Sequence, residues 1–310
     1  MKIKVLGSGA GGGLPQWNCN AINSKDARSG HEFVKPRSQS SIAVSSNEKD
    51  WVLLNASPDI RQQIFDNKEL HPHEDGPIRN SPIQAVMLTN GDVDHVTGLL
   101  CLREGHPFNL YASNRVLGTI NANTIFNVLN PEKVNRIETG LNTPFEVMSP
   151  KGSTGIEITP FNVPGKVALY LEEKKADGTF GTQEGDTIGL YVKEISTGKG
   201  FYYIPGCAEV DQPLRERITG AELIFFDGTL FTNNEMLDQG LLPKTGERMG
   251  HMNMSGDDGT LKIFEDMNID RKIYIHINNS NPVLRDNSDE RKTVESNGWE
   301  VSYDGMKVTL

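Results

Sequence analysis

The chain has 310 residues, of which 36% are hydrophobic and 23% charged, a composition typical of water-soluble globular proteins. Its formal net charge of -10 argues against a nucleic-acid-binding protein, because a phosphate backbone requires a basic surface. No apolar run approaches the roughly 18 residues of a membrane-spanning helix, and three widely spaced cysteines do not form a disulfide framework. The first residues enter a strand-like run directly, so we expect no signal peptide and a cytoplasmic location.

Strand-like runs dominate the sequence, and helical patterns lie irregularly among them. This order differs from a strict βαβ repeat and indicates layered sheets with helices outside. No repeat, low-complexity tract or linker divides the sequence, so we expect one domain over residues 1–310. The predicted strands are residues 2–6, 41–44, 51–54, 85–88, 108–111, 156–163, 169–172, 187–195, 200–204, 223–226, 272–277 and 307–310, and the predicted helices are residues 59–66, 115–129, 259–267 and 288–296.

Two segments near the N-terminus lack a regular period. Residues 7–13 are rich in glycine and formally contain G-x-G-x-x-G, but neither a helical pattern nor a suitably spaced acidic residue follows. We therefore expect a close approach of backbone or ligand there rather than a dinucleotide site. Residues 18–37 are polar and are predicted to form a long surface loop.

Residues 88–99 carry two carboxylates and an imidazole within four positions. They follow an apolar strand and lead into residues 98–103, which are predicted to begin a helix. In such a loop the adjacent Asp94 and His95 can both face one cation, with Asp92 close by. The same residues also fit an Asn-Gly turn with an acidic helix cap. The stretch alone leaves both interpretations open.

Polar groups also follow the ends of three later predicted strands. They are Cys207, Asp227 and His276, and a further histidine, His251, lies among glycines and small polar residues that indicate a folded loop. For either histidine alone, a hydrogen-bonded structural role is the commoner explanation. Because sites in layered α/β folds gather at strand ends, the joint pattern favours a metal site.

Together these segments resemble the metallo-β-lactamase superfamily, which carries T-H-x-H-x-D-H after a strand and isolated polar ligands at later strand ends. The matching run is residues 89–95. Over essentially its whole length, the chain is similar to the branch of this superfamily that acts in pyrroloquinoline quinone (PQQ) biosynthesis. The resemblance implies a four-layer αββα sandwich of the α/β class, with the site at one edge of the sheets. The segments that carry it are residues 6–19, 94–100, 102–105, 203–207, 227–229, 249–253 and 275–282.

Several ligands of the superfamily are absent. Its first two histidines fall on Asn90 and Asp92, and residues 164–165, Pro-Gly, stand where a later histidine is expected. The usual bridging aspartate falls on Cys207, which could touch a metal as a thiolate or be a buried, inert thiol. A dinuclear zinc hydrolase is disfavoured, because the second ion has lost its ligands.

The resemblance leaves Asp94, His95 and His276 as metal ligands. Two histidines and one carboxylate form the facial triad of non-haem Fe(II) oxygenases, which leaves positions open for dioxygen and substrate. The resemblance therefore implies an iron-dependent hydroxylase that uses O2 on the tyrosine ring of a cross-linked Glu-Tyr precursor of PQQ. Zinc could occupy the same site in purified protein.

Roles for neighbouring residues follow from this interpretation. His251 and Asp92 are predicted to be catalytic: His251 would exchange a proton near the ring, and Asp92 would ligate the metal or orient a water molecule. Arg103, Asn253 and Asn278 are predicted to bind substrate, with Arg103 meeting a carboxylate, although an arginine on a helix surface fits equally well.

Two other functions stay open. A carrier of PQQ or its precursor, assisting transport to the periplasm, would need a pocket but no open metal positions. A zinc hydrolase that trims the precursor peptide is weakened by the lost ligands. We expect the peptide-derived precursor and other PQQ biosynthesis proteins as partners, and a homodimer is compatible with the sequence. Because relatives carry a cysteine cluster where this chain has only Cys19, we expect no structural zinc there and a more mobile loop.

Overall fold

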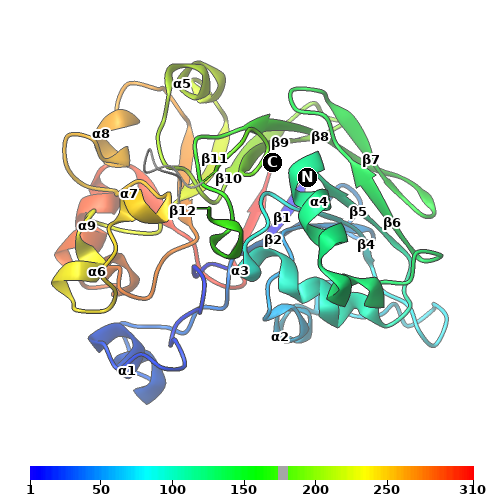
Figure 1. Ribbon diagram of the computed structural model, residues 1–310, viewed down its shortest axis with the longest axis horizontal. Coiled ribbons are helices and arrows are strands. Elements are labelled where there is room, and N and C mark those ends of the chain that lie inside the picture. Colours follow the sequence, from blue (N-terminus) through cyan, green and yellow to red (C-terminus); the bar gives the residue numbers. More distant parts are fainter. Residues whose placement is uncertain (174–180) are drawn as a thin grey trace.

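Two seven-stranded sheets pack face to face in the computed structural model, which describes residues 1–173 and 181–310 (Figure 1). The first sheet has the order β14-β1-β2-β3-β4-β5-β6, and the second has the order β13-β12-β11-β10-β9-β8-β7. The first consists of β1 (Lys2–Gly7), β2 (Ser41–Ser45), β3 (Trp51–Leu54), β4 (Ile83–Met87), β5 (Phe108–Ala112), β6 (Val134–Glu138) and β14 (Lys307–Thr309). The second consists of β7 (Phe145–Ser149), β8 (Gly152–Asn162), β9 (Ile188–Glu194), β10 (Gly200–Ile204), β11 (Leu223–Asp227), β12 (Arg271–Ile275) and β13 (Trp299–Val301).

Each sheet is antiparallel in one half and parallel in the other. The parallel half of the first sheet consists of β3, β4, β5 and β6. The parallel half of the second sheet consists of β10, β11, β12 and β13. Parallel strands end at the same edge, so the loops after them converge there. The loops after β4, β11 and β12 carry most of the residues predicted to form the site.

Alternation along the strands separates a core between the sheets from two cores outside them. In β11, Phe225 points into the central core, whereas its neighbours Ile224 and Phe226 pack under the outer helices. Because both faces of these strands are buried, their sequences are almost continuously apolar.

Helices cover the outer face of both sheets (Figure 1). Ile60 and Val116 pack on the first sheet, and Leu214 and Val294 pack on the second. The four layers confirm the predicted αββα sandwich. In the described ranges, no helix combines the length and apolarity needed to cross a membrane. The helices are α1 (Ile22–Ser29), α2 (Ile60–Asp66), α3 (Val93–Val96), α4 (Asn114–Ala122), α5 (Gln212–Ile218), α6 (Glu235–Asp238), α7 (Gly246–Met249), α8 (Thr260–Ile263) and α9 (Asp289–Ser296), with 3-10 helices η1 (Lys68–Leu70), η2 (Thr97–Arg103), η3 (Thr124–Val128), η4 (Leu169–Leu171) and η5 (Pro282–Leu284).

Three predictions of local structure were wrong. Residues 18–37 are not all loop, because they contain α1, whose buried side chains are Asn23, Ser24 and Ala27 and therefore give no apolar period. Residues 169–172 form the 3-10 helix η4 rather than a strand. The predicted helix 115–129 is divided by an extended residue, Asn123, into α4 and η3.

Three strands escaped prediction, and all of them lie at sheet edges. They are β6, β7 and β13. Edge strands bury few side chains: in both β6 and β7 only one residue is fully buried. Without an apolar run, the sequence signal of such a strand is weak.

The two sheets are joined by hydrogen bonds at the edge where the site lies. After β1 and β12, Gly9 and Ile277 pair as a short parallel bridge. The Ala10 amide donates to the Ile277 carbonyl over 2.9 Å, and the Ile277 amide donates to the Ser8 carbonyl over 2.9 Å. The predicted close approach in residues 7–13 is confirmed: a Cβ atom on Gly7 would lie 2.1 Å from the Gln39 carbonyl oxygen.

Candidate metal centre

The candidate ligands come from two strand ends, one in each sheet. Asp94 and His95 lie in α3 after β4, and His276 directly follows β12. One ligand atom from each of these residues lies within 4.8 Å of the others. The structure therefore brings together the three residues that the sequence singled out.

His276 is held in an unusual backbone conformation. Its φ of 59° lies in the left-handed region, which residues other than glycine seldom occupy. The hydrogen bonds of Ile277 with the loop after β1 hold the chain in this turn. Such conformations are found where function requires a particular side-chain direction.

A hydrogen bond to Asn90 fixes the His95 ring. The Asn90 side-chain amide nitrogen donates to Asp92 Oδ2 over 2.9 Å, so its oxygen faces the other way. That oxygen lies 2.7 Å from His95 Nδ1, and because it can only accept, Nδ1 carries the proton. Nε2 then bears a lone pair, and it is buried without a hydrogen-bond partner among the described residues. A buried, unpaired lone pair beside a carboxylate fits a metal ligand.

Thr229 fixes the His276 ring with its proton on Nδ1, as Asn90 does for His95. Its hydroxyl lies 2.6 Å from Asp227 Oδ1, to which it donates, and 2.9 Å from His276 Nδ1. Since the hydroxyl proton is used on the carboxylate, His276 Nδ1 donates to the hydroxyl oxygen. Nε2 of His276 then faces Asp94, whose Oδ2 is 3.1 Å away.

The Thr229 hydroxyl also lies at the centre of a second group of possible metal ligands. Asp227, His251 and His276 also bring ligand atoms within 4.8 Å of one another. Thr229 Oγ1 sits among them, 2.6 Å from Asp227 Oδ1, 3.1 Å from His251 Nδ1 and 2.9 Å from His276 Nδ1. His251 Nδ1 is also 2.6 Å from Asp227 Oδ2. These atoms satisfy one another, whereas in the group of Asp94, His95 and His276 the Nε2 atom of His95 has no hydrogen-bond partner among the described residues.

Burial and neighbouring charges set His95 and Asp94 in the protonation states that a cation requires. Burial lowers the pKa of His95 to about 4, so its ring is neutral at pH 7, as a ligand must be. Burial opposes ionisation of Asp94, but the neighbouring His95 and His276 outweigh it and lower the pKa of that carboxyl. Burial, together with the charge of Asp94, raises the pKa of Asp92. Asp94 therefore ionises more readily than Asp92.

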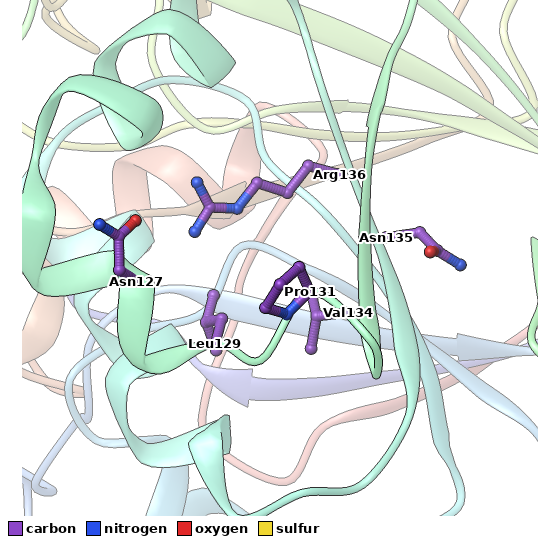
Figure 2. Close-up of a pocket in the computed structure, with 6 residues that line it drawn as sticks. All are labelled: Asn127, Leu129, Pro131, Val134, Asn135 and Arg136. Carbon is purple, nitrogen blue, oxygen red and sulfur yellow. The ribbon is translucent and has the colours of Figure 1, made fainter.

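A cavity of about 310 Å³ opens onto the centre. Polar and charged side chains line it beside the ligands, and both signs of charge are represented. The lining includes Asp92, His251, Asn278, Lys166 and Lys244. A larger cavity of about 440 Å³ lies elsewhere, between η3 and β6; its lining has no carboxylate or imidazole, so it has no metal ligands of these kinds (Figure 2).

Two predicted substrate-binding residues lie outside the site cavity. The Arg103 side chain is 56% exposed, and its guanidinium donates to the Leu100 carbonyl over 3.3 Å, because η2 carries it along the surface. Asn253 lines a neighbouring cavity of about 420 Å³, which His251 separates from the centre. Among the residues described as lining the site cavity, Asn278 is the predicted substrate-binding residue.

Cys207 matches the description of a buried, inert thiol. Its side chain is fully buried, and the thiol donates to the Glu209 carbonyl over 3.1 Å. Burial raises its pKa well above the usual range, so the thiol stays protonated at neutral pH. Its backbone amide donates to Asp227 Oδ2 over 2.9 Å and thereby supports the carboxylate behind His251.

The sequence analysis did not predict that Thr229 and Asn90 orient the histidine rings, or that two lysines line the site cavity. A hydroxyl residue two positions after the strand-end Asp227 is a signal that could have indicated Thr229. Lys166 and Lys244 lie in loops without any period, and only the folded chain places them at the cavity.

A buried carboxyl stands behind the cavity wall. Glu235 in α6 accepts a hydrogen bond from the Phe231 amide over 2.8 Å and contacts the Ser280 hydroxyl, which in turn contacts Asn278. The Glu235 residue is only 4% exposed, and this burial raises its pKa to about 7.

Comparison with known proteins first defines the class. Residues 50–277 match the family model of the beta-lactamase superfamily domain. Together with the two-sheet sandwich and the ligands at its edge, this match defines a protein of the metallo-β-lactamase class.

Full-length relatives define the family within that class. The chain is 48% identical over 312 residues to coenzyme PQQ synthesis protein B of Bradyrhizobium diazoefficiens, and 47% identical over 310 residues to that of Methylorubrum extorquens. Each comparison covers 100% of this chain and 100% of the relative. It also matches the crystal structure of Zn²⁺-bound PqqB from Methylobacterium extorquens, with a TM-score of 0.93, 47% identity and 100% of both chains covered. The chain belongs to the coenzyme PQQ synthesis protein B family.

The role of Thr229 can be tested by Thr229→Val, which keeps the shape and removes the hydroxyl. The His276 ring then loses the acceptor of its Nδ1 proton, and we expect metal affinity to fall about 10- to 100-fold. Competition titration with a chromogenic chelator measures this change. Thr229→Ser restores the hydroxyl and should bind metal like the wild type. Equal losses in both variants would contradict the hydrogen-bonding role.

Replacing the buried carboxyl should change how stability depends on pH. The folded-state pKa of Glu235, about 7, exceeds its ordinary value of 4.5, so its contribution to stability is present below pH 4.5 and is lost as the pH rises through about 7. Glu235→Gln keeps a donor and an acceptor without the charge. We expect it to raise the free energy of unfolding by up to about 3 kcal/mol at pH 8 and to have little effect near pH 4.

Urea unfolding across this pH range measures the effect. The exposed Glu132 offers a matched control, because Glu132→Gln should leave the pH profile unchanged. A Glu235→Gln profile parallel to that of the wild type would show that this carboxyl does not titrate in the folded protein.

Proposed function

We propose that this protein takes part in PQQ biosynthesis as a mononuclear, Fe(II)- and O2-dependent hydroxylase of the tyrosine ring of a cross-linked Glu-Tyr precursor. The observation that carries the proposal is a group of two imidazoles and one carboxylate, whose ligand atoms lie within 4.8 Å of one another beside a cavity. Non-haem iron oxygenases use this donor set because it leaves positions open for dioxygen and substrate. The names of the full-length relatives support the pathway.

The donor set also argues against a dinuclear hydrolase. The positions of the first superfamily histidines are occupied by Asn90 and Asp92, which bond to each other and orient His95. Thr229 occupies the other group of possible ligands. Among the described residues, a second ion that would share a bridging hydroxide therefore has no other group of three ligand atoms that Thr229 does not already contact.

Each residue of the centre has a defined task in this proposal. Asp94, His95 and His276 would hold the metal, which when bound supplies the activation of dioxygen that aromatic hydroxylation requires. His251 is held by Asp227 through its Nδ1 proton, so its Nε2 is available to accept a proton from the phenol or the ring. Asp92 lines the cavity next to the ligands and can orient a water molecule or the substrate.

The remaining expectations stand as predictions alongside this proposal. They are a single domain over residues 1–310, a cytoplasmic location, contact with other PQQ biosynthesis proteins and a homodimer. The related PqqB structure contains Zn²⁺, so a member of this family binds zinc, and a donor set of two histidines and one carboxylate can hold zinc as well as iron.

The test is to load the purified protein anaerobically with Fe(II) and then add O2, a reductant and a cross-linked Glu-Tyr peptide. Mass spectrometry should detect added oxygen atoms in the product with the wild type. Asp94→Ala and His276→Ala each remove a ligand, and we expect both to lower oxygen incorporation by at least about 100-fold. Isotopically labelled O2 identifies the source of the oxygen.

Two results would reject the hydroxylase. Peptide cleavage by the zinc-loaded protein, without oxygen incorporation by the iron-loaded form, would indicate a hydrolase. No reaction, together with equally tight PQQ binding by the wild type and both alanine variants, would indicate the carrier.

A further inference from the structure

Two lysines line the cavity at the metal centre without contacting the ligands through any described hydrogen bond. Lys166 lies in the loop after β8, and Lys244 lies just before α7. We infer that Lys166 and Lys244 form an anion site that receives a carboxylate of an aromatic substrate beside the metal centre. This inference rests on the proposed function and deepens it by naming the chemical class of the substrate and the residues that select it.

Lys166 is held in place by an ion pair and by packing. Its Nζ lies 3.0 Å from Glu172 Oε1, and Arg248 Nη2 lies 2.8 Å from the other oxygen of the same carboxylate. The stem of Lys166 packs on Gly250, where an added Cβ atom would lie 2.8 Å from its Cγ. An ammonium has three N–H donors, so Lys166 can still donate to a ligand.

Lys244 offers a second positive charge on the same cavity. Its side chain is half-buried, and no carboxylate lies within ion-pair distance of it in the described ranges. A partly desolvated ammonium interacts more strongly with an anion than one in bulk water does. A carboxylate between Lys244 and Lys166 would gain charge-assisted hydrogen bonds.

The charge balance of the cavity also favours an anion. The carboxylates that line it are Asp92 and Asp94, and a bound divalent cation offsets both. The positive charge of Lys244 then remains for the ligand, and Lys166 adds a donor beside it. A neutral or cationic substrate would leave the charge of Lys244 uncompensated in a partly buried site.

The rest of the lining identifies the other half of the ligand. Leu169, Leu242 and Met249 provide apolar surface in the same cavity. Its volume of about 310 Å³ lies at the lower end of ligand pockets, which are about 300–1,000 Å³. The cavity therefore suits one aromatic ring that carries a carboxylate, such as a tyrosine unit with a free carboxyl group.

The test compares two small probes that differ only in charge. N-acetyl-L-tyrosine carries the carboxylate, and N-acetyl-L-tyrosinamide carries a neutral amide. With the zinc-loaded wild type, calorimetry should show at least about tenfold tighter binding of the acid. We expect Lys166→Gln and Lys244→Gln each to reduce this preference severalfold or more, and Lys244→Arg to retain it.

Controls separate charge recognition from other effects. Lys262 is 62% exposed and lies outside the cavity lining, so Lys262→Gln should keep the wild-type preference. The inference would be overturned if the wild type bound the acid and the amide equally well, or if both glutamine variants kept the wild-type preference for the acid. It would also be overturned if the glutamine variants lost affinity for the acid and the amide to the same extent. Because the zinc-loaded assay involves no oxygen chemistry, a retained preference without hydroxylation would reject the hydroxylase and leave the anion site standing.

Discussion

Two hydrogen bonds donated by imidazole Nδ1 atoms determine what this centre can bind. Asn90 accepts from His95, and Thr229 accepts from His276, so the Nε2 atoms of both rings face the Asp94 side. A metal-binding imidazole needs such a partner to fix its tautomer and orientation. The same two partners stand where further ligands could otherwise be, and this makes the centre suited to one ion rather than two.

The fold supplies the rigidity that these hydrogen bonds require. Parallel strands in both sheets end at one edge, and the loop after β1 is joined to the residue after His276 by backbone hydrogen bonds. The left-handed φ of 59° at His276 is compatible only with a chain fixed on both sides. The supporting hydrogen bonds therefore depend on the contact between the sheets as much as on the local sequence.

The sequence predicted the αββα sandwich and the group of Asp94, His95 and His276, because buried strands are apolar runs and their ends carry isolated polar residues. It did not predict β6 and β7, because edge strands bury few side chains. A sequence does not show which side of η2 faces the cavity. Arg103 was therefore predicted to bind substrate, whereas its side chain lies on the surface outside the site cavity. The lysines escaped notice because loop residues carry no period, and their positions depend on the folding of distant segments.

If one ion binds at Asp94, His95 and His276 while Thr229 excludes a second, anomalous X-ray diffraction at the iron edge will locate it in crystals loaded anaerobically with excess Fe(II). We expect one anomalous peak within bonding distance of all three residues, and none between Asp227 and His251. A second peak at that position, or a single peak that His95 does not contact, would show that Thr229 does not exclude a second ion or that these three residues do not hold the first.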